Sequence, residues 1–248
     1  MRASLTASDV EKELRALGVQ AGMALEVHCS LSSFGHIEGG ADALLDALIR
    51  VVGADGAVVM PSFCLSPELP LAEEDRALGI VTKIRILSEE EERSAMGIVA
   101  DTFRQRPDVV TGSGTFRVSA WGRDAQAYAA SGFGRVIEGG GYALLLGVDI
   151  YRLSAMHHVE DVLPDEIHGK FRPSEEARAR YPEGQWMIQA WTPEAKPWYV
   201  IQEEAYAKGM IADALIGDAR CMLFQVEPVV HLYRRALLER PLELYGLR

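Results

Sequence analysis

The sequence predicts an α/β fold: a mixed, mostly parallel central sheet with helices on both faces and a small inserted antiparallel lobe. Two observations carry this prediction. An apolar strand at residues 24–28 connects to a second strand at 57–60 through a loop, an amphipathic helix and a turn, as parallel strands require. Residues 142–148 (YALLLGV) form an apolar run without alternation, which is typical of a strand covered on both faces.

The first elements follow in order from the N-terminus. Ser8 and Glu11 form an S-x-x-E capping box, so we expect a helix that continues to Gly18. The second helix carries its apolar residues between positions 44 and 52, and Pro61 ends the strand that follows it.

Further elements are predicted in the rest of the chain. Helical periodicity covers 96–106, strand formers broken by Gly112 and Gly114 occupy 109–118, and a last helix is expected over 229–239. Residues 165–208 contain three of the four tryptophans and many carboxylates, which indicates a lobe of short antiparallel strands and loops. We therefore expect one domain over residues 1–248, with this smaller acidic, Trp-rich lobe at about 165–208.

The composition excludes several classes of protein. The 248 residues are 48% hydrophobic and 25% charged, unlike a disordered chain, a collagen or a disulfide scaffold. No apolar run approaches the roughly 18 residues of a membrane span, and the N-terminal residues lack the apolar core of a signal peptide. The net charge of −11 argues against nucleic acid or an anionic membrane as a partner and favours a cationic small molecule.

The cysteines indicate the compartment. Cys29, Cys64 and Cys221 are few, odd in number and widely spaced, so we expect reduced thiols and a cytoplasmic protein. The sequence leaves both a monomer and a homodimer open.

The loop after the first strand is the first candidate site. Small residues leave backbone N–H groups free, and ligands bind beyond the carboxyl ends of strands in open α/β sheets, so an anionic or thioester ligand fits here. An ordinary strand-to-helix loop is the alternative. The candidate residues are His28, Cys29, Ser30, Leu31, Ser32, Ser33, Phe34 and Gly35.

A histidine–carboxylate pair beyond the strand at 142–148 is the second candidate. On a helix, His157 shares a face with Glu160 and Asp161. A carboxylate that holds one ring nitrogen leaves the other nitrogen free to take a proton, which is the arrangement of a general base. The alternative is a solvated helix end at which His157 and His158 only pack or cap.

Zinc-type ligands make a metal site, and with it a metal-dependent hydrolase that uses His157, His158 and His168, a further alternative. His157, His158, Glu160 and His168 offer suitable ligand atoms. Adjacent histidines on a helix point about 100° apart, however, and the spacing is not H-E-x-x-H. We therefore expect no metal.

Carboxylates among the tryptophans form the third candidate. Such a surface suits a polycationic ligand, because negative charges and aromatic faces both attract cations. Solvated surface charge is the alternative. The candidate acceptor-binding residues are Glu194 and Glu203 from this lobe, with Glu68 from outside it.

Four ordered segments resemble the aminoglycoside 3-N-acetyltransferase family. VHCSLSSFG at 27–35 is similar to that family's VHSSLSSFG-type segment, and the stretch at 39–63 resembles its next helix, turn and strand. MGIVADTFRQRPDVV at 96–110 resembles its M-G-x-x-x-x-x-F-R-x-x-P segment. LLLGVDIYRLSAMHHVED at 144–161 resembles its arrangement of L-L-L-G-V and H-x-x-E.

The resemblance implies an enzyme that transfers acetyl from acetyl-CoA to a ring amine of a deoxystreptamine antibiotic. His157 would be the general base and Glu160 its orienting partner. The loop at 28–35 would line the acetyl-CoA channel, with Phe103 and Gly112 as further cofactor contacts.

Two departures from the family pattern keep alternatives open. The family's R-S-x-H-P element is replaced at Thr111–Thr115, so a CoA-binding member with a different acceptor or without turnover is one alternative. Cys29 stands where serine is common, which raises an acyl-enzyme route beside direct transfer. A buried cysteine is more often inert, so we expect direct transfer.

Overall fold

A seven-stranded sheet forms the centre of the computed structural model, which describes residues 4–247. The strand order is β4-β5-β2-β1-β6-β9-β8. The strands are β1 (Ala24–Cys29), β2 (Ala57–Pro61), β4 (Val110–Thr111), β5 (Val118–Gly122), β6 (Tyr142–Leu146), β8 (Ala212–Ile216) and β9 (Ala219–Gln225).

The sheet is mixed, as predicted, and its parallel part lies at the centre. β1 runs parallel to both β2 and β6, so the predicted β–α–β unit is confirmed. The other four pairings are antiparallel, so the expectation of a mostly parallel sheet holds only for these three strands. The antiparallel share is larger because β8 and β9 form a hairpin across Gly217 and Asp218, with Gly217 in the left-handed region.

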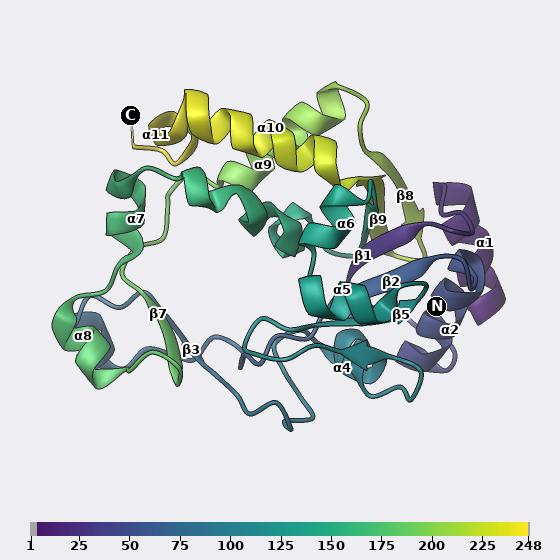
Figure 1. Cartoon of the computed structure of the whole chain (residues 1–248), viewed down its shortest axis with the longest axis horizontal. Helices are drawn as coiled ribbons and strands as arrows, with labels where there is room; N and C mark the ends of the chain where they lie inside the picture. The colour runs from purple at the N-terminus through teal and green to yellow at the C-terminus, as the bar shows by residue number, and fades with distance from the viewer. Residues whose placement is uncertain (1–3, 248) are drawn as a thin grey trace.

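Alternate side chains of each strand enter two hydrophobic cores, one on each face of the sheet. In β6, Leu144 and Leu146 enter one core, and Ala143 and Leu145 enter the other. The first core is covered by α1 (Ala7–Leu17), α2 (Gly40–Val52) and α4 (Ile98–Arg104). The second is covered by α5 (Ala125–Ser131), α6 (Gly134–Glu138), α9 (Pro197–Ala207) and α10 (Val226–Glu239) (Figure 1).

The cap of the first helix differs from the prediction. The first helix is capped by Thr6, whose Oγ accepts the N–H of Asp9 at 3.2 Å, while the Asp9 carboxylate accepts the N–H of Thr6 at 2.9 Å. This capping box replaces the predicted pair of Ser8 and Glu11, because Ser8 already lies inside the first turn. The strand formers at 109–118, predicted to be broken by Gly112 and Gly114, belong to two strands, β4 and β5, separated by a turn.

The predicted lobe at 165–208 contains more helix and fewer strands than expected. Its elements are α7 (Asp165–Phe171), α8 (Glu175–Arg180), β7 (Trp186–Gln189) and α9. β7 pairs antiparallel with β3 (Thr82–Arg85), a strand from earlier in the chain. Figure 1 shows β3, β7 and α8 together at one end, whereas α9 packs against the main body through Trp198 and Ile201.

Several short helices complete the described chain. They are α3 (Glu73–Ala77), α11 (Pro241–Leu244) and the 3-10 helices η1 (Leu31–Phe34), η2 (Ile150–Arg152) and η3 (Ser154–Val162). No helix within residues 4–247 is long and apolar enough to cross a membrane.

Candidate active site

A cavity of about 800 Å³ opens at the carboxyl ends of the three parallel strands. Its wall includes His28 and Cys29 from β1, Pro61 from β2, and Val148 just after β6. Side chains that follow parallel strands meet at one edge of a sheet, which is where open α/β sheets bind ligands. His157 lies in the same wall, so the first two candidate sites form one cavity.

His157 and Glu160 form the hydrogen-bonded pair that the sequence predicts. They lie on the 3-10 helix η3, in which residues three apart stand directly above one another. His157 Nδ1 is 2.6 Å from Glu160 Oε2, and the ring packs edge-on against Trp198 at a centroid distance of 4.8 Å. The His157 side chain is 63% exposed, so its second ring nitrogen, Nε2, is accessible to a ligand. This geometry is that of a general base with an orienting carboxylate.

Two tyrosines hold the other side of Glu160. The hydroxyl of Tyr233 donates to Glu160 Oε1 at 3.0 Å, and its oxygen lies 2.8 Å from the hydroxyl of Tyr245. Burial and the neighbouring Glu160 charge raise the pKa of Tyr233, so it remains a proton donor, and burial raises the pKa of Tyr245 to about 12. Because Tyr233 has one proton, Tyr245 donates to the Tyr233 oxygen. No local sequence pattern indicates this chain of hydrogen bonds, since α10 lies far from His157 in sequence.

The neighbouring histidine points elsewhere. His158 does not line the cavity, and its Cε1 would lie 3.2 Å from a Cβ added at Gly134 of α6. His168 lies exposed on α7. Among the described residues, no group of three His, Cys, Asp or Glu side chains is placed to hold a metal ion. The hydrolase alternative therefore gains no support from the arrangement of these histidines.

Most of the predicted loop lines the cavity. The lining residues from this loop are His28, Cys29, Ser30, Leu31, Ser32 and Gly35. Ser33 and Phe34 do not line it: the Ser33 hydroxyl donates to the Gly147 carbonyl at 3.0 Å, and Phe34 is buried in the core. Both residues hold the loop in place.

The protein itself uses some of the backbone amides in this loop. The N–H of Ser30 donates to the carbonyl of Leu146 at 2.9 Å, and that of Ser33 donates to the carbonyl of Ser30 at 3.2 Å. The N–H groups of Leu31 and Ser32 lie in the first turn of η1, where N–H groups have no acceptor within the helix itself.

Two predicted cofactor contacts have structural roles. Phe103 is 0% exposed in the core beneath α4, so a ligand cannot reach its ring without unpacking the helix. Gly112 lies against α5, and a Cβ at that position would come within 2.3 Å of the Ala129 carbonyl oxygen. Close packing of two backbone segments explains this glycine. The segment at 111–115, where the R-S-x-H-P element is replaced, does not line the cavity either.

The thiol of Cys29 lines the cavity but is poorly suited to attack. Burial, and to a smaller extent the neighbouring Cys221, raises the pKa of the Cys29 thiol well above its ordinary value. Burial also raises the pKa of Cys221, to about 11. The thiolate is the nucleophilic form, so both groups are largely unreactive near neutral pH.

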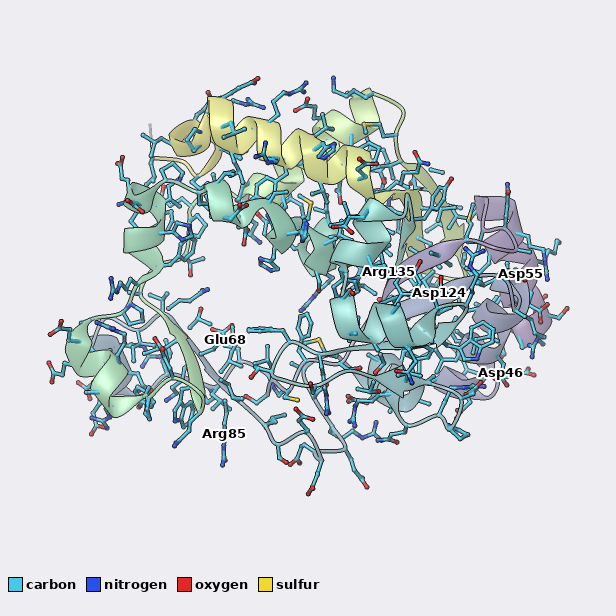
Figure 2. The ribbon with its side chains drawn as sticks, in the orientation of Figure 1. Asp46, Asp55, Glu68, Arg85, Asp124 and Arg135 are labelled. Carbon is cyan, nitrogen blue, oxygen red and sulfur yellow. The ribbon has the colours of Figure 1, made fainter. Side chains whose placement is uncertain are left out.

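The three predicted acceptor carboxylates lie outside the cavity. Glu68, Glu194 and Glu203 are exposed and do not line it. Figure 2 shows Glu68 on the side of the molecule that holds β3 and β7. The sequence could not place them, because surface carboxylates carry no periodic signal. The charged residue in the wall is instead Arg152.

Aromatic side chains that were not predicted from the sequence as site residues form part of the wall. Tyr151 stacks on Trp198 at a centroid distance of 5.2 Å, and both line the cavity. The ammonium group of Lys196 lies 5.8 Å from the ring of Tyr151 and 5.5 Å from that of Tyr199. The rings of Tyr151 and Tyr199 therefore already contact a cation of the protein itself.

A second histidine–carboxylate pair joins His28, which lines the cavity, to Glu26, which lies buried behind it. His28 Nε2 is 2.8 Å from Glu26 Oε1; the His28 side chain is 6% exposed and that of Glu26 is 0% exposed. His28 was predicted from the sequence as a site residue, and Glu26 was not. The available signal was a carboxylate inside the apolar strand Ala24–Cys29, because buried glutamates are rare unless they are paired.

Comparison with known proteins places this arrangement in a family. The family model described as aminoglycoside 3-N-acetyltransferase matches residues 27–238. The prophage-derived aminoglycoside N(3')-acetyltransferase-like protein YokD of Bacillus subtilis (strain 168) is 29% identical over 180 residues. That alignment covers 64% of this chain and 66% of YokD, so the matched part spans about two thirds of that relative's length.

Solved structures show the same fold. The apoenzyme of aminoglycoside acetyltransferase AAC(3)-IVa superposes with a TM-score of 0.72 at 21% identity, covering 99% of this chain and 92% of that one. The binary complex of AAC-IIIb with CoASH superposes with a TM-score of 0.69 at 20% identity, covering 96% and 98%. The family model spans most of the chain, from β1 into α10. This chain therefore belongs to the aminoglycoside 3-N-acetyltransferase family.

Proposed function

We propose that the protein transfers an acetyl group directly from acetyl-CoA to an amino group of an aminoglycoside, at the 3-N position, with His157 as general base. The observation that carries the proposal is the His157–Glu160 pair, which leaves one imidazole nitrogen accessible in a cavity lined by the 28–35 loop. Family membership supports the reaction class. The related structure with CoASH supports CoA as the cosubstrate.

The proposed chemistry follows from the geometry of the pair. The acceptor amine attacks the thioester carbon while His157 Nε2 takes its proton, so that a C–N bond forms and the C–S bond breaks. The thiolate of CoA leaves, and it or water then takes the proton from the imidazolium. Glu160 stabilises that imidazolium, and the Tyr233 hydroxyl at 3.0 Å holds Glu160 in place.

Direct transfer is supported over an acyl-enzyme route. The one cysteine in the cavity wall, Cys29, has a thiol whose pKa is raised by burial. A protonated thiol attacks a thioester poorly, and no described hydrogen bond links Cys29 to a histidine that would deprotonate it.

An acceptor panel tests the proposal. Purified protein is incubated with acetyl-CoA and gentamicin-, neomycin- or apramycin-like acceptors, and free CoA thiol is followed with a chromogenic disulfide. We expect thiol release that depends on the acceptor, and an acetylated product in the mass spectrum. Binding of acetyl-CoA by calorimetry without release in any arm would favour a CoA-binding member of the family without turnover.

An acceptor with fewer positive charges is the second candidate. The described cavity wall contains Arg152 and no carboxylate. The ammonium group of Lys196 already lies against the rings of Tyr151 and Tyr199. The positive charge of Arg152 repels a polycation more strongly than it repels a monoamine. Monoamine sugars and simple primary amines therefore belong in the same panel. Faster turnover with a monoamine than with any aminoglycoside would select this candidate.

The cellular setting is part of the proposal. The cysteines at 29, 64 and 221 are all free thiols, which supports a reducing compartment and hence the cytoplasm. We propose one acetyltransferase domain that works as a monomer or homodimer. Size-exclusion chromatography with light scattering decides between these two states.

A further inference from the structure

The side chain of Glu26 is a buried carboxylate with no part in the chemistry proposed above. It lies on β1 and is 0% exposed. Its Oε2 atom has no hydrogen-bond partner within the described structure. An unpartnered carboxylate oxygen in a protein interior is unfavourable, and an apolar side chain of similar volume avoids that penalty. Fold stability alone therefore does not explain a glutamate at this position.

The other oxygen of Glu26 joins two segments that line the cavity. Oε1 accepts the N–H of Ala155 at 3.0 Å and lies 2.8 Å from Nε2 of His28. The N–H of Ser154 lies 3.4 Å from that same ring nitrogen, which is the longer of the two contacts. A nitrogen that donates cannot also accept in the ring plane, so we assign its proton to the shorter contact, with Glu26.

This assignment determines what His28 offers to a ligand. With Nε2–H donated to Glu26, Nδ1 carries the lone pair and has no partner among the described hydrogen bonds. The ring is further held by Phe133 at a centroid distance of 5.9 Å. His28 lines the cavity, so Nδ1 is the nitrogen left for a ligand.

The Ala155 contact links Glu26 to His157. Ala155 lies two residues before His157, in the first turn of η3. N–H groups in the first turn of a helix lack partners in the helix itself, and 3-10 helices have poorer hydrogen-bond geometry than α-helices. The buried Glu26 carboxylate on β1 therefore supplies a hydrogen-bond acceptor for the first turn of η3.

We propose that Glu26 is a positioning residue for both histidines of the cavity. One carboxylate oxygen holds His28 in its Nε2–H form and fixes the turn that places His157 over the cavity. The kinetic part of this inference rests on the proposed acetyl transfer. The structural part does not, because it concerns the protonation and orientation of two side chains.

Imidazole NMR tests the structural part without any activity. In long-range ¹H–¹⁵N spectra of ¹⁵N-labelled protein at pH 8, with His28→Gln used for assignment, we expect His28 to show a protonated Nε2 and an unprotonated Nδ1. In Glu26→Met, this pattern should be lost and the His157 signals should shift. A protonated Nδ1 in the wild-type protein, or unchanged signals of both histidines in Glu26→Met, would overturn the proposal.

Kinetics test the link to His157. Glu26→Met should lower kcat at least tenfold and change the KM for acetyl-CoA less than threefold, whereas Glu26→Gln, which keeps an oxygen acceptor, should lose less. In a His157→Ala background, Glu26→Met should change the residual rate less than twofold. Leu25→Val, a buried neighbour on the opposite face of β1, is the control for lost packing and should keep kcat.

Three kinetic outcomes contradict the proposal. The first is a folded Glu26→Met protein with wild-type kcat or, where that variant does not fold, a Glu26→Gln protein with wild-type kcat. The second is an equal loss of kcat on Glu26→Met with and without His157. The third is an equal loss of kcat in Leu25→Val. If the wild-type chain transfers no acetyl group at all, the proposed function fails, and the NMR result still decides the role of Glu26.

Discussion

Tyr233→Phe removes one hydroxyl and isolates the hydrogen bond that holds Glu160. Tyr233 is fully buried, so phenylalanine fills the same volume without opening a cavity. The change deletes the 3.0 Å bond to Glu160 Oε1 and leaves the 2.6 Å contact between Glu160 Oε2 and His157 Nδ1 in place. Glu160 is then oriented by His157 alone.

The expected size of the effect follows from the type of bond. A hydrogen bond to a charged group contributes about 1.5–3 kcal/mol, and part of this loss is recovered because the Glu160 side chain is 25% exposed and water can replace the hydroxyl. A remaining loss of about 1–2 kcal/mol in transition-state stabilisation lowers kcat roughly 5- to 30-fold. The free energy of unfolding should fall by a similar amount.

The assay compares Tyr233→Phe with Tyr245→Phe. The second variant removes the outer bond of 2.8 Å and leaves Tyr233 donating to Glu160, so its kcat should stay within about threefold of wild type. Both variants are measured by thiol release at saturating substrates, with urea unfolding beside them. Wild-type kcat in Tyr233→Phe together with a large loss in Tyr245→Phe would refute this reasoning.

Two further predictions concern the thiol and the small sheet. Because burial raises the pKa of Cys29, iodoacetamide should modify this thiol much more slowly at pH 8 than it modifies a small thiol in solution. For the same reason, Cys29→Ser should keep most of the activity. An acetylated Cys29 peptide in the mass spectrum after incubation with acetyl-CoA alone would contradict both expectations. Asp75, buried and bonded to Lys83 and Tyr181, has its pKa lowered to about 2, first by Lys83 and then by Tyr181. A carboxylate whose pKa is lowered in the folded state stabilises the fold above about pH 4, and this stabilisation is lost as the pH falls toward 2. Asp75→Asn should therefore cost about 2–3 kcal/mol at pH 7 and flatten the loss of stability on acidification, both measured by urea unfolding; an unchanged acid profile would contradict the assignment.

Local patterns in the sequence predicted the elements that surround the site. The β–α–β unit follows from apolar runs and turn residues that are close together in the chain, and β1, α2 and β2 lie where these signals place them. The spacing of His157 and Glu160 predicted a shared face. It holds on the observed 3-10 helix as it would on an α-helix, because residues three apart are neighbours on both.

Contacts between distant segments were beyond the sequence. Tyr233 reaches Glu160 from α10, and Glu26 reaches Ala155 across 129 positions, so no local spacing marks either contact. Phe103 was predicted to contact the cofactor and instead packs in the core. The sequence alone does not distinguish an aromatic residue that packs in a core from one that contacts a ligand. The antiparallel outer strands β8 and β9 were missed because the hairpin turn at Gly217 and Asp218 was not recognised.

The most direct test of the central claim compares His157→Ala with His158→Ala. Loss of a general base lowers a rate by about 10²–10⁴-fold, so His157→Ala should lose nearly all acetyl transfer while its calorimetric affinity for acetyl-CoA stays close to wild type. His158 lies outside the cavity and against α6, so His158→Ala should transfer acetyl at close to the wild-type rate. An active His157→Ala enzyme beside an inactive His158→Ala enzyme, or equal rates in both variants and the wild type, would contradict the assignment of His157 as the base.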